Sequence, residues 1–137
     1  MKTLAIIVVS SALAACSPIS IKDLRDEPPY KTATFQADYS EIGNCVLDKL
    51  IESPSSAWEG KLGNLQYESV IVKKSGVMRI TGSAVSHFKI PIVDLSFSHK
   101  DGVSVVEVRA GGFDGGPRDP WLKYADDAWL YVEECAN

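Results

Sequence analysis

The stretch from Ile92 to Ala110 constrains the fold more than any other part of the chain. Two runs of alternating apolar and polar residues flank the dipeptide Asp101-Gly102, which suits the type I′ turn of a two-residue hairpin. This turn sets the register of the two strands. On one face it pairs Phe97 with Val106, Leu95 with Val108 and Val93 with Ala110. It also pairs Asp94 with Arg109, and His99 with Ser104 at the end of the hairpin. Because a single register buries the apolar positions and pairs opposite charges, the sequence predicts two antiparallel strands here.

A further hairpin is predicted between Tyr67 and Ser83. A three-residue loop, Lys74-Ser75-Gly76, places glycine where a left-handed residue is needed. This loop sets Val72 opposite Met78, Val70 opposite Ile80 and Ser69 opposite Thr81, which makes one face apolar. A two-residue turn at Ser75-Gly76 would set Val72 against Arg79, so the pleat favours the longer loop. Between the hairpins, Val85–Ile90 can add a strand, with Pro91 at a bulge or an edge.

Two helices are predicted to flank these strands. Asp38 with Glu41 three residues later resembles a capping box and indicates a helix from about Asp38 to Glu52. Asp119-Pro120 is typical of a helix start. The apolar stripes of the two helices are Tyr39, Ile42, Val46 and Leu50 in the first, and Trp121, Ala125, Ala128, Val132 and Cys135 in the second. The expected fold is α+β: an antiparallel meander sheet of four to five strands, flanked by an N-terminal and a C-terminal helix on one face.

The chain opens on MKTLAIIVVSSALAAC, which has the layout of a secretory signal peptide. Lys2 is followed by a short apolar run, Leu4–Val9, that is too short to span a bilayer as a helix, and then by small residues. A buried N-terminal strand or helix is the alternative, but no turn residue or polar face accompanies the run. Residues 1–15 are therefore expected to be removed.

The four residues Leu13-Ala14-Ala15-Cys16 resemble the lipobox of bacterial lipoproteins. The resemblance implies that Cys16 is lipidated and becomes the first residue of the mature chain, so that its acyl chains hold it to a lipid bilayer. Ser17 stands where an Asp often signals inner-membrane retention in Gram-negative members. The resemblance therefore favours the periplasmic face of the bacterial outer membrane, and it implies an address rather than a fold or an activity.

Removal of residues 1–15 from the 137-residue chain leaves 122 residues, which suits one domain. Lys2 is the only charged residue lost, so the formal net charge moves from −4 to −5. This acidic balance, without a basic stripe, argues against a nucleic-acid partner. Cys45 and Cys135 remain as an even pair in an exported protein, which predicts a disulfide between the two helices, with free buried thiols as the alternative.

Residues 16–34 are expected to form a lipidated cysteine and a tether, and residues 35–137 the single α+β domain. Prolines 18, 28 and 29 interrupt the segment, and several charges keep it solvated. A strand around Phe35 is the alternative for the last few residues only. The tether would hold the domain away from the bilayer.

The sequence contains no motif that indicates a particular reaction. His87 and His99 are the only histidines, and His-Glu-x-x-His, Cys-x-x-Cys and Gly-x-Ser-x-Gly are absent from the sequence. In Ser86-His87 and Ser98-His99, neighbours on a strand point to opposite faces. Asp114 and Asp119 lack calcium-loop spacing. We therefore expect no catalytic residue, no metal and no cofactor.

The irregular segments hold the candidate partner-binding residues, which are Trp58, Phe113, Asp114 and Arg118. Glycines of the loop Gly111–Asp119 can present backbone N–H groups to an anion, although the spacing is neither a dinucleotide fingerprint nor a P-loop, and a flexible connection is the alternative. Trp58 lies in a Ser/Gly-rich loop, where it either fills the core or faces a partner.

Two classes of function remain. The first is a non-enzymatic module that binds an envelope or periplasmic protein, as an accessory of an envelope or secretion assembly or as an inhibitor or immunity protein. The second is a small envelope hydrolase or small-ligand carrier that uses the Gly111–Asp119 loop. This alternative requires a pocket lined by Asp114, Arg118 and a histidine.

The lipid anchor gives the first testable prediction. Replacing Cys16 with Ala removes the thiol to which lipid would be attached, so palmitate labelling is expected to disappear and the protein to leave the membrane fraction. Unchanged labelling or fractionation of the variant would contradict a lipoprotein.

Overall fold

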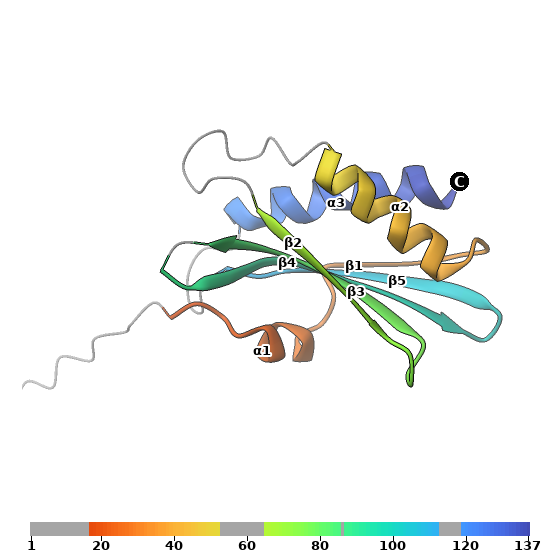
Figure 1. Cartoon of the computed structure of the whole chain (residues 1–137), viewed down its shortest axis with the longest axis horizontal. Coiled ribbons are helices and arrows are strands. Elements are labelled where there is room, and N and C mark those ends of the chain that lie inside the picture. Colours follow the sequence, from red (N-terminus) through yellow and green to blue (C-terminus); the bar gives the residue numbers. More distant parts are fainter. Residues whose placement is uncertain (1–16, 53–64, 86, 113–118) are drawn as a thin grey trace, which may run out of the picture.

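The structure is a computed structural model that describes residues 17–52, 65–85, 87–112 and 119–137. Its elements in chain order are α1 (Ile21–Asp26), β1 (Lys31–Phe35), α2 (Tyr39–Glu52), β2 (Gln66–Val72), β3 (Val77–Val85), β4 (Lys89–Lys100), β5 (Val103–Ala110) and α3 (Asp119–Ala136). The strands form one antiparallel sheet in the order β1-β5-β4-β3-β2. Helices α2 and α3 lie together on one face and α1 on the other (Figure 1). The predicted α+β meander is confirmed.

The main core lies between the sheet and the pair α2 and α3. Its largest fully buried side chains include Phe97 and Leu95 of β4, Ile80 of β3 and Ile42 of α2. Gly43 lets α2 approach the sheet closely, because a Cβ there would stand 2.5 Å from the sulfur of Met78. The apolar stripes predicted for both helices therefore face the sheet.

The predicted cap of α2 and the predicted disulfide between α2 and α3 are both present. The Asp38 carboxylate accepts hydrogen bonds from the backbone N–H groups of Ser40 at 2.8 Å and Glu41 at 3.2 Å, which caps α2. These bonds, with one from the Ser40 hydroxyl, lower the pKa of Asp38. Cys45 of α2 and Cys135 of α3 form a disulfide with a Cα–Cα distance of 5.9 Å, which confirms the predicted pair.

The β4–β5 hairpin confirms the predicted register at every position. Asp94 lies opposite Arg109, Phe97 opposite Val106 and His99 opposite Ser104. Both turn residues have positive φ, 52° at Asp101 and 84° at Gly102, as a type I′ turn requires. Local turn chemistry and the alternation of apolar residues agree here, so sequence alone was sufficient.

The predicted register of the β2–β3 hairpin is wrong by one residue. The turn has four residues, Lys73 to Gly76, so Val72 lies opposite Val77 and Val70 opposite Arg79. Gly76 does take the left-handed conformation, with φ 61°. The observed register sets Tyr67 opposite Gly82, where its ring covers the glycine on the core face. Val70 and Val72 consequently point to the other face of the sheet.

Val85–Ile90 does not form a separate strand. β3 continues to Val85 and β4 begins at Lys89, and the two strands pair with each other, so the two ends of this segment belong to neighbouring strands. The bulge expected at Pro91 is present: Ser83 lies opposite Pro91 and Gly82 opposite Val93, which leaves Ile92 as the extra residue.

The tether expected over 16–34 is wrong from Ile19 onward. Ile19 is buried, and Leu24 of α1 is completely buried against the sheet. The Ser20 hydroxyl accepts a hydrogen bond from the N–H of Asp23 at 3.1 Å and caps α1. β1 then pairs with β5, with Lys31 opposite Val108. The composition of this segment is polar overall, but its few apolar residues are spaced to be buried in a sheet that the rest of the chain supplies.

Replacing both Cys45 and Cys135 with Ala tests the contribution of the disulfide. The bridge closes a loop of 90 residues. On the chain-entropy model, its loss is expected to lower the free energy of unfolding by about 4 kcal/mol. Urea unfolding of the double variant, compared with the oxidised parent protein, measures this loss. A change below about 1 kcal/mol would mean that the bridge constrains little in the unfolded chain.

Candidate binding site

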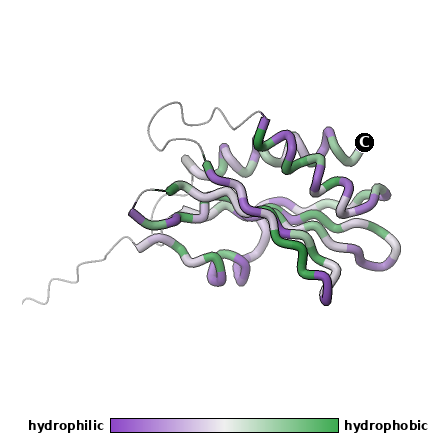
Figure 2. Tube along the Cα trace, in the orientation of Figure 1, coloured by the Kyte–Doolittle hydropathy of each residue, from purple (hydrophilic) through white to green (hydrophobic). Residues whose placement is uncertain are grey.

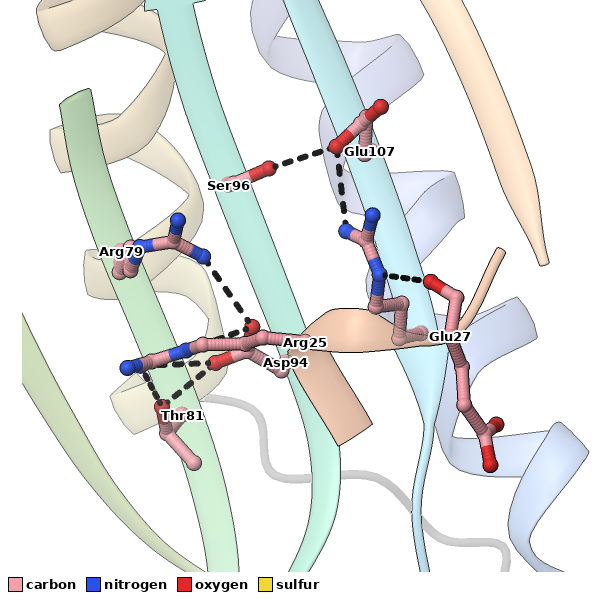
Figure 3. A network of polar contacts seen from close by, with 8 residues as sticks. Arg25, Glu27, Arg79, Thr81, Asp94, Ser96 and Glu107 are labelled. Carbon is pink, nitrogen blue, oxygen red and sulfur yellow. Dashed lines mark hydrogen bonds and ion pairs between the residues drawn. The ribbon is translucent and has the colours of Figure 1, made fainter. Parts of the chain in front are cut away.

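The face of the sheet opposite α2 and α3 carries most of the buried polar chemistry. Side chains from α1, β3, β4 and β5 meet there (Figure 3). Hydrogen bonds and ion pairs link Arg25, Arg79, Thr81 and Asp94 in one group, and Ser96, Glu107 and Arg109 in another. Within the described ranges, every buried side-chain nitrogen and oxygen has a partner.

Asp94 lies at the centre of the first group. Its side chain is fully buried in β4, the middle strand. The carboxylate accepts hydrogen bonds from Arg25 Nε and Nη2, both at 3.3 Å, and from the Thr81 hydroxyl at 2.7 Å. Arg79 Nη1 adds an ion pair at 3.8 Å. Two guanidinium groups therefore share one carboxylate, and one of them belongs to α1.

Arg109 holds the C-terminal end of α1, next to the contact made by Arg25. Its Nε donates to the backbone carbonyl of Glu27 at 2.8 Å, and its Nη1 donates to the Glu107 carboxylate at 3.1 Å. Although Asp94 and Arg109 are register partners, their charges do not pair as the sequence predicted. Instead, Arg25 of the N-terminal segment pairs with Asp94, and Arg109 donates a hydrogen bond to the backbone carbonyl oxygen of Glu27 in the same segment.

A cavity of about 290 Å³ opens on this face between α1 and the strands β2, β3 and β4. Ile19, Ile21 and Val70 are apolar parts of its wall. Arg25, Arg79 and Lys89 bring positive charge, and Glu68 is the one carboxylate of the lining. Lys89 is ion-paired with Glu68, and Arg25 and Arg79 share Asp94, which leaves one net positive charge. This balance suits an occupant with a single carboxylate and some apolar surface.

The cavity adjoins one of the two edges of the sheet, the one formed by β2. In the described part of the chain β2 pairs with β3 only, so its outer edge carries no strand. Val70, Ile71 and Val72 are 56%, 54% and 40% exposed, and Val70 also lines the cavity. Tyr67, in the same strand, is anchored in the core, and burial raises its pKa to about 12. The first half of β2 is thus fixed by Tyr67, and its second half, Val70 to Val72, is apolar and accessible.

Most of the site residues predicted from the sequence lie outside the part of the chain that the structure describes. They are Cys16, Trp58, Phe113, Asp114 and Arg118. His87 and His99 are both exposed and stand near opposite ends of β4, so the structure does not bring them together.

Gly111 and Gly112, which open the Gly111–Asp119 loop, have packing roles. A Cβ on Gly111 would stand 2.1 Å from the carbonyl oxygen of Pro91, and one on Gly112 would stand 2.4 Å from the indole nitrogen of Trp121. These glycines allow the chain to pass between β4 and α3.

The sequence does not reveal the cluster around Asp94, because the prolines and charges near Arg25 predict a tether there. One signal was available: Asp94 is a lone acidic residue in the otherwise apolar run Ile90-Pro91-Ile92-Val93-Asp94-Leu95. A carboxylate in such a run requires a charged partner, and the choice of partner depends on the position of the N-terminal segment.

Comparisons of the chain with protein-family models, with curated proteins and with solved structures give no match. Among residues 17–52, 65–85, 87–112 and 119–137, no helix has the length and apolar character needed to cross a membrane. The same residues contain no group of three or more side chains arranged to hold a metal ion.

The ion pair between Arg25 and Asp94 predicts a specific effect on α1. Arg25→Met keeps the aliphatic stem but leaves the buried carboxylate with Thr81 and Arg79 only. We expect the free energy of unfolding to fall by about 2 kcal/mol, less than for a pair that loses all its partners. Amide hydrogen exchange over residues 19–30 is expected to accelerate as well.

Lys22→Met is the matched control, because Lys22 lies in the same helix and pairs with Asp26 at an exposed position. This variant is expected to unfold like the parent protein. Equal stability of the Arg25 and Lys22 variants in urea would show that Asp94 does not hold α1.

Proposed function

We propose that the protein is a lipid-anchored, non-enzymatic module of the bacterial envelope that binds an extended segment of a partner protein. The anchor is Cys16, at the periplasmic face of the outer membrane. The binding surface is the outer edge of β2, together with the adjoining cavity. The observation that carries this proposal is the run of three exposed apolar residues, Val70 to Val72, on an edge strand that, in the described part of the chain, pairs with β3 only.

An edge strand presents unpaired backbone N–H and C=O groups, which a further strand can satisfy. Proteins usually protect such edges with charges, prolines or bulges, but Val70, Ile71 and Val72 are all apolar. Neighbouring residues on a strand alternate between faces, so an added segment would contact Ile71 on the helix side and Val70 on the cavity side. Main-chain hydrogen bonds would supply affinity and these side chains specificity.

The cavity indicates which partner segment fits. Its apolar wall and its one net positive charge, from Arg25, Arg79 and Lys89 against their two carboxylates, favour an acidic side chain or a terminal carboxylate. The proposed partner is therefore an envelope or periplasmic protein with an extended segment that alternates apolar residues with a carboxylate.

The envelope location is supported by two features of the chain. The Leu13-Ala14-Ala15-Cys16 motif resembles a lipobox, and the Cys45–Cys135 disulfide suits an oxidising compartment. The hydrolase or carrier alternative receives no specific support from the described residues, because Gly111 and Gly112 are explained by packing. Trp58, Phe113, Asp114 and Arg118 stay candidate contacts of the partner.

Site-specific photo-crosslinking in cells tests the edge. A photoreactive residue at position 72 is expected to give one discrete protein adduct. The same residue at Leu130, which is 55% exposed on α3, is expected to give none. Mass spectrometry should place the partner's cross-linked residue in an extended segment with a nearby carboxylate. Adducts at positions 58 or 113 without one at 72 would move the interface to those loops.

Ile71→Lys provides the matched quantitative test. A lysine on an edge strand opposes the addition of a further strand, so adduct formation is expected to fall at least tenfold. Thermal stability should stay unchanged, because Ile71 is 54% exposed. Leu130→Lys, at a position of equal exposure, should leave the adduct unaffected. An undiminished adduct in the Ile71 variant would contradict strand addition.

A further inference from the structure

The domain begins very close to the proposed anchor. The N–H of Ile19 donates to the carbonyl oxygen of Gly112 at 3.0 Å, and α1 is held by Arg25 and Arg109. Cys16 is only three residues before Ile19. Because an extended residue spans at most about 3.5 Å, the Cα atoms of Cys16 and Ile19 can be no more than about 10 Å apart. A lipid on Cys16 would therefore hold this end of the domain at the bilayer surface.

The turn between β3 and β4 lies at this same end. The N–H of Gly112 donates to the carbonyl oxygen of Pro91 at 2.9 Å, two residues into β4. Ile19 and Lys89 line the same cavity. The described chain starts beside this turn, whereas the β2–β3 and β4–β5 turns are at the opposite end of the sheet (Figure 1).

The turns at the two ends of the sheet differ in composition. Near the start of the described chain, Val85 and Phe88 are 43% and 53% exposed. At the far end the turns are Lys73 to Gly76 and Asp101-Gly102, which are polar (Figure 2). A large apolar side chain near a hairpin tip gains free energy if it leaves water. Exposed apolar side chains occur at both ends, since Val70 to Val72 precede the far turn, but Val85 and Phe88 are the ones at the end beside Cys16, within reach of the bilayer that would hold it.

We propose that the β3–β4 turn is a membrane-contacting surface, with Val85 and Phe88 entering the headgroup region of the bilayer that holds Cys16. This inference rests on the proposed lipid anchor. Apolar side chains can enter this boundary region from a peripheral element, and the anchor raises the effective concentration of the turn at the surface. Two contact points, the acyl chains and the turn, would fix the orientation of the domain.

This orientation leaves the proposed binding edge accessible. β2 starts near the membrane end, where Gln66 lies opposite Ser83, and runs away from it to Val72 beside the polar turn. The exposed residues Val70 to Val72 are therefore in the half of the strand farther from the bilayer. The membrane and the partner segment would occupy different ends of the same sheet.

Lipid quenching tests the contact in the full lipidated protein, reconstituted in phosphatidylethanolamine and phosphatidylglycerol vesicles. Phe88→Cys is labelled with an environment-sensitive fluorophore, since Cys45 and Cys135 are bridged and Cys16 would be acylated. Ile71→Cys, at matched exposure, and Ser75→Cys in the far turn are the controls. A nitroxide on the lipid headgroup is expected to quench the label at 88 several-fold more than those at 71 and 75.

Because a fluorophore can itself insert, a second variant removes the native side chain. With the label on Val85→Cys, Phe88→Ser should reduce quenching, whereas Ile71→Ser should not. Equal quenching at 88, 71 and 75 in protein that floats with the vesicles overturns the contact and leaves the anchor intact. Protein that does not float with the vesicles removes the anchor, and the contact with it.

Discussion

The carboxylate of Asp94 sits in the middle strand of the sheet, cut off from solvent by the side chains around it. A charge in that position is costly unless it is paired, and Arg25 supplies the pair from a short helix that is far away in the chain. Six residues of α1 could not form a stable helix alone, so this contact and the burial of Leu24 are what order the N-terminal segment. The cavity exists because α1 is held there: Ile19, Ile21 and Arg25 form one of its walls.

The same ion pair connects the two proposed surfaces. With α1 docked, the distance from Cys16 to the folded domain is set by three residues instead of a flexible tether of nineteen positions, 16–34. The end of the sheet near the β3–β4 turn is then the end closest to the anchor, and the exposed half of β2 faces away from it. A released α1 would remove one wall of the cavity and would also lengthen the link between Cys16 and the folded domain. The position of the domain relative to the proposed anchor and the shape of the cavity would thus both depend on the docking of α1.

Sequence patterns succeeded where local chemistry and periodicity agreed. Asp101-Gly102 and its alternating flanks specify one register, and Asp38 and Asp119 mark the starts of α2 and α3. They failed at the β2–β3 hairpin, where a three-residue and a four-residue turn both bring Gly76 into a left-handed conformation. The packing of Tyr67 over Gly82 decides between them, and that contact joins residues of two strands on the core face. The ion pair between Arg25 and Asp94 could not be predicted from local patterns, because the two residues are 69 positions apart.

By itself, the sequence determined the α+β meander and the two covering helices, because turn residues, caps and apolar spacing act over a few neighbours. It also predicted the Cys45–Cys135 bridge, because these two cysteines remain as an even pair once Cys16 is assigned to lipid. Only the tertiary structure decided that residues 19–34 belong to the domain, that Val70 to Val72 lie on an open edge, and that a cationic cavity adjoins them. Each of these depends on the free energy of burial between segments far apart in the chain. A polar segment with few apolar residues becomes ordered only when a sheet formed by other residues offers those few a place to be buried.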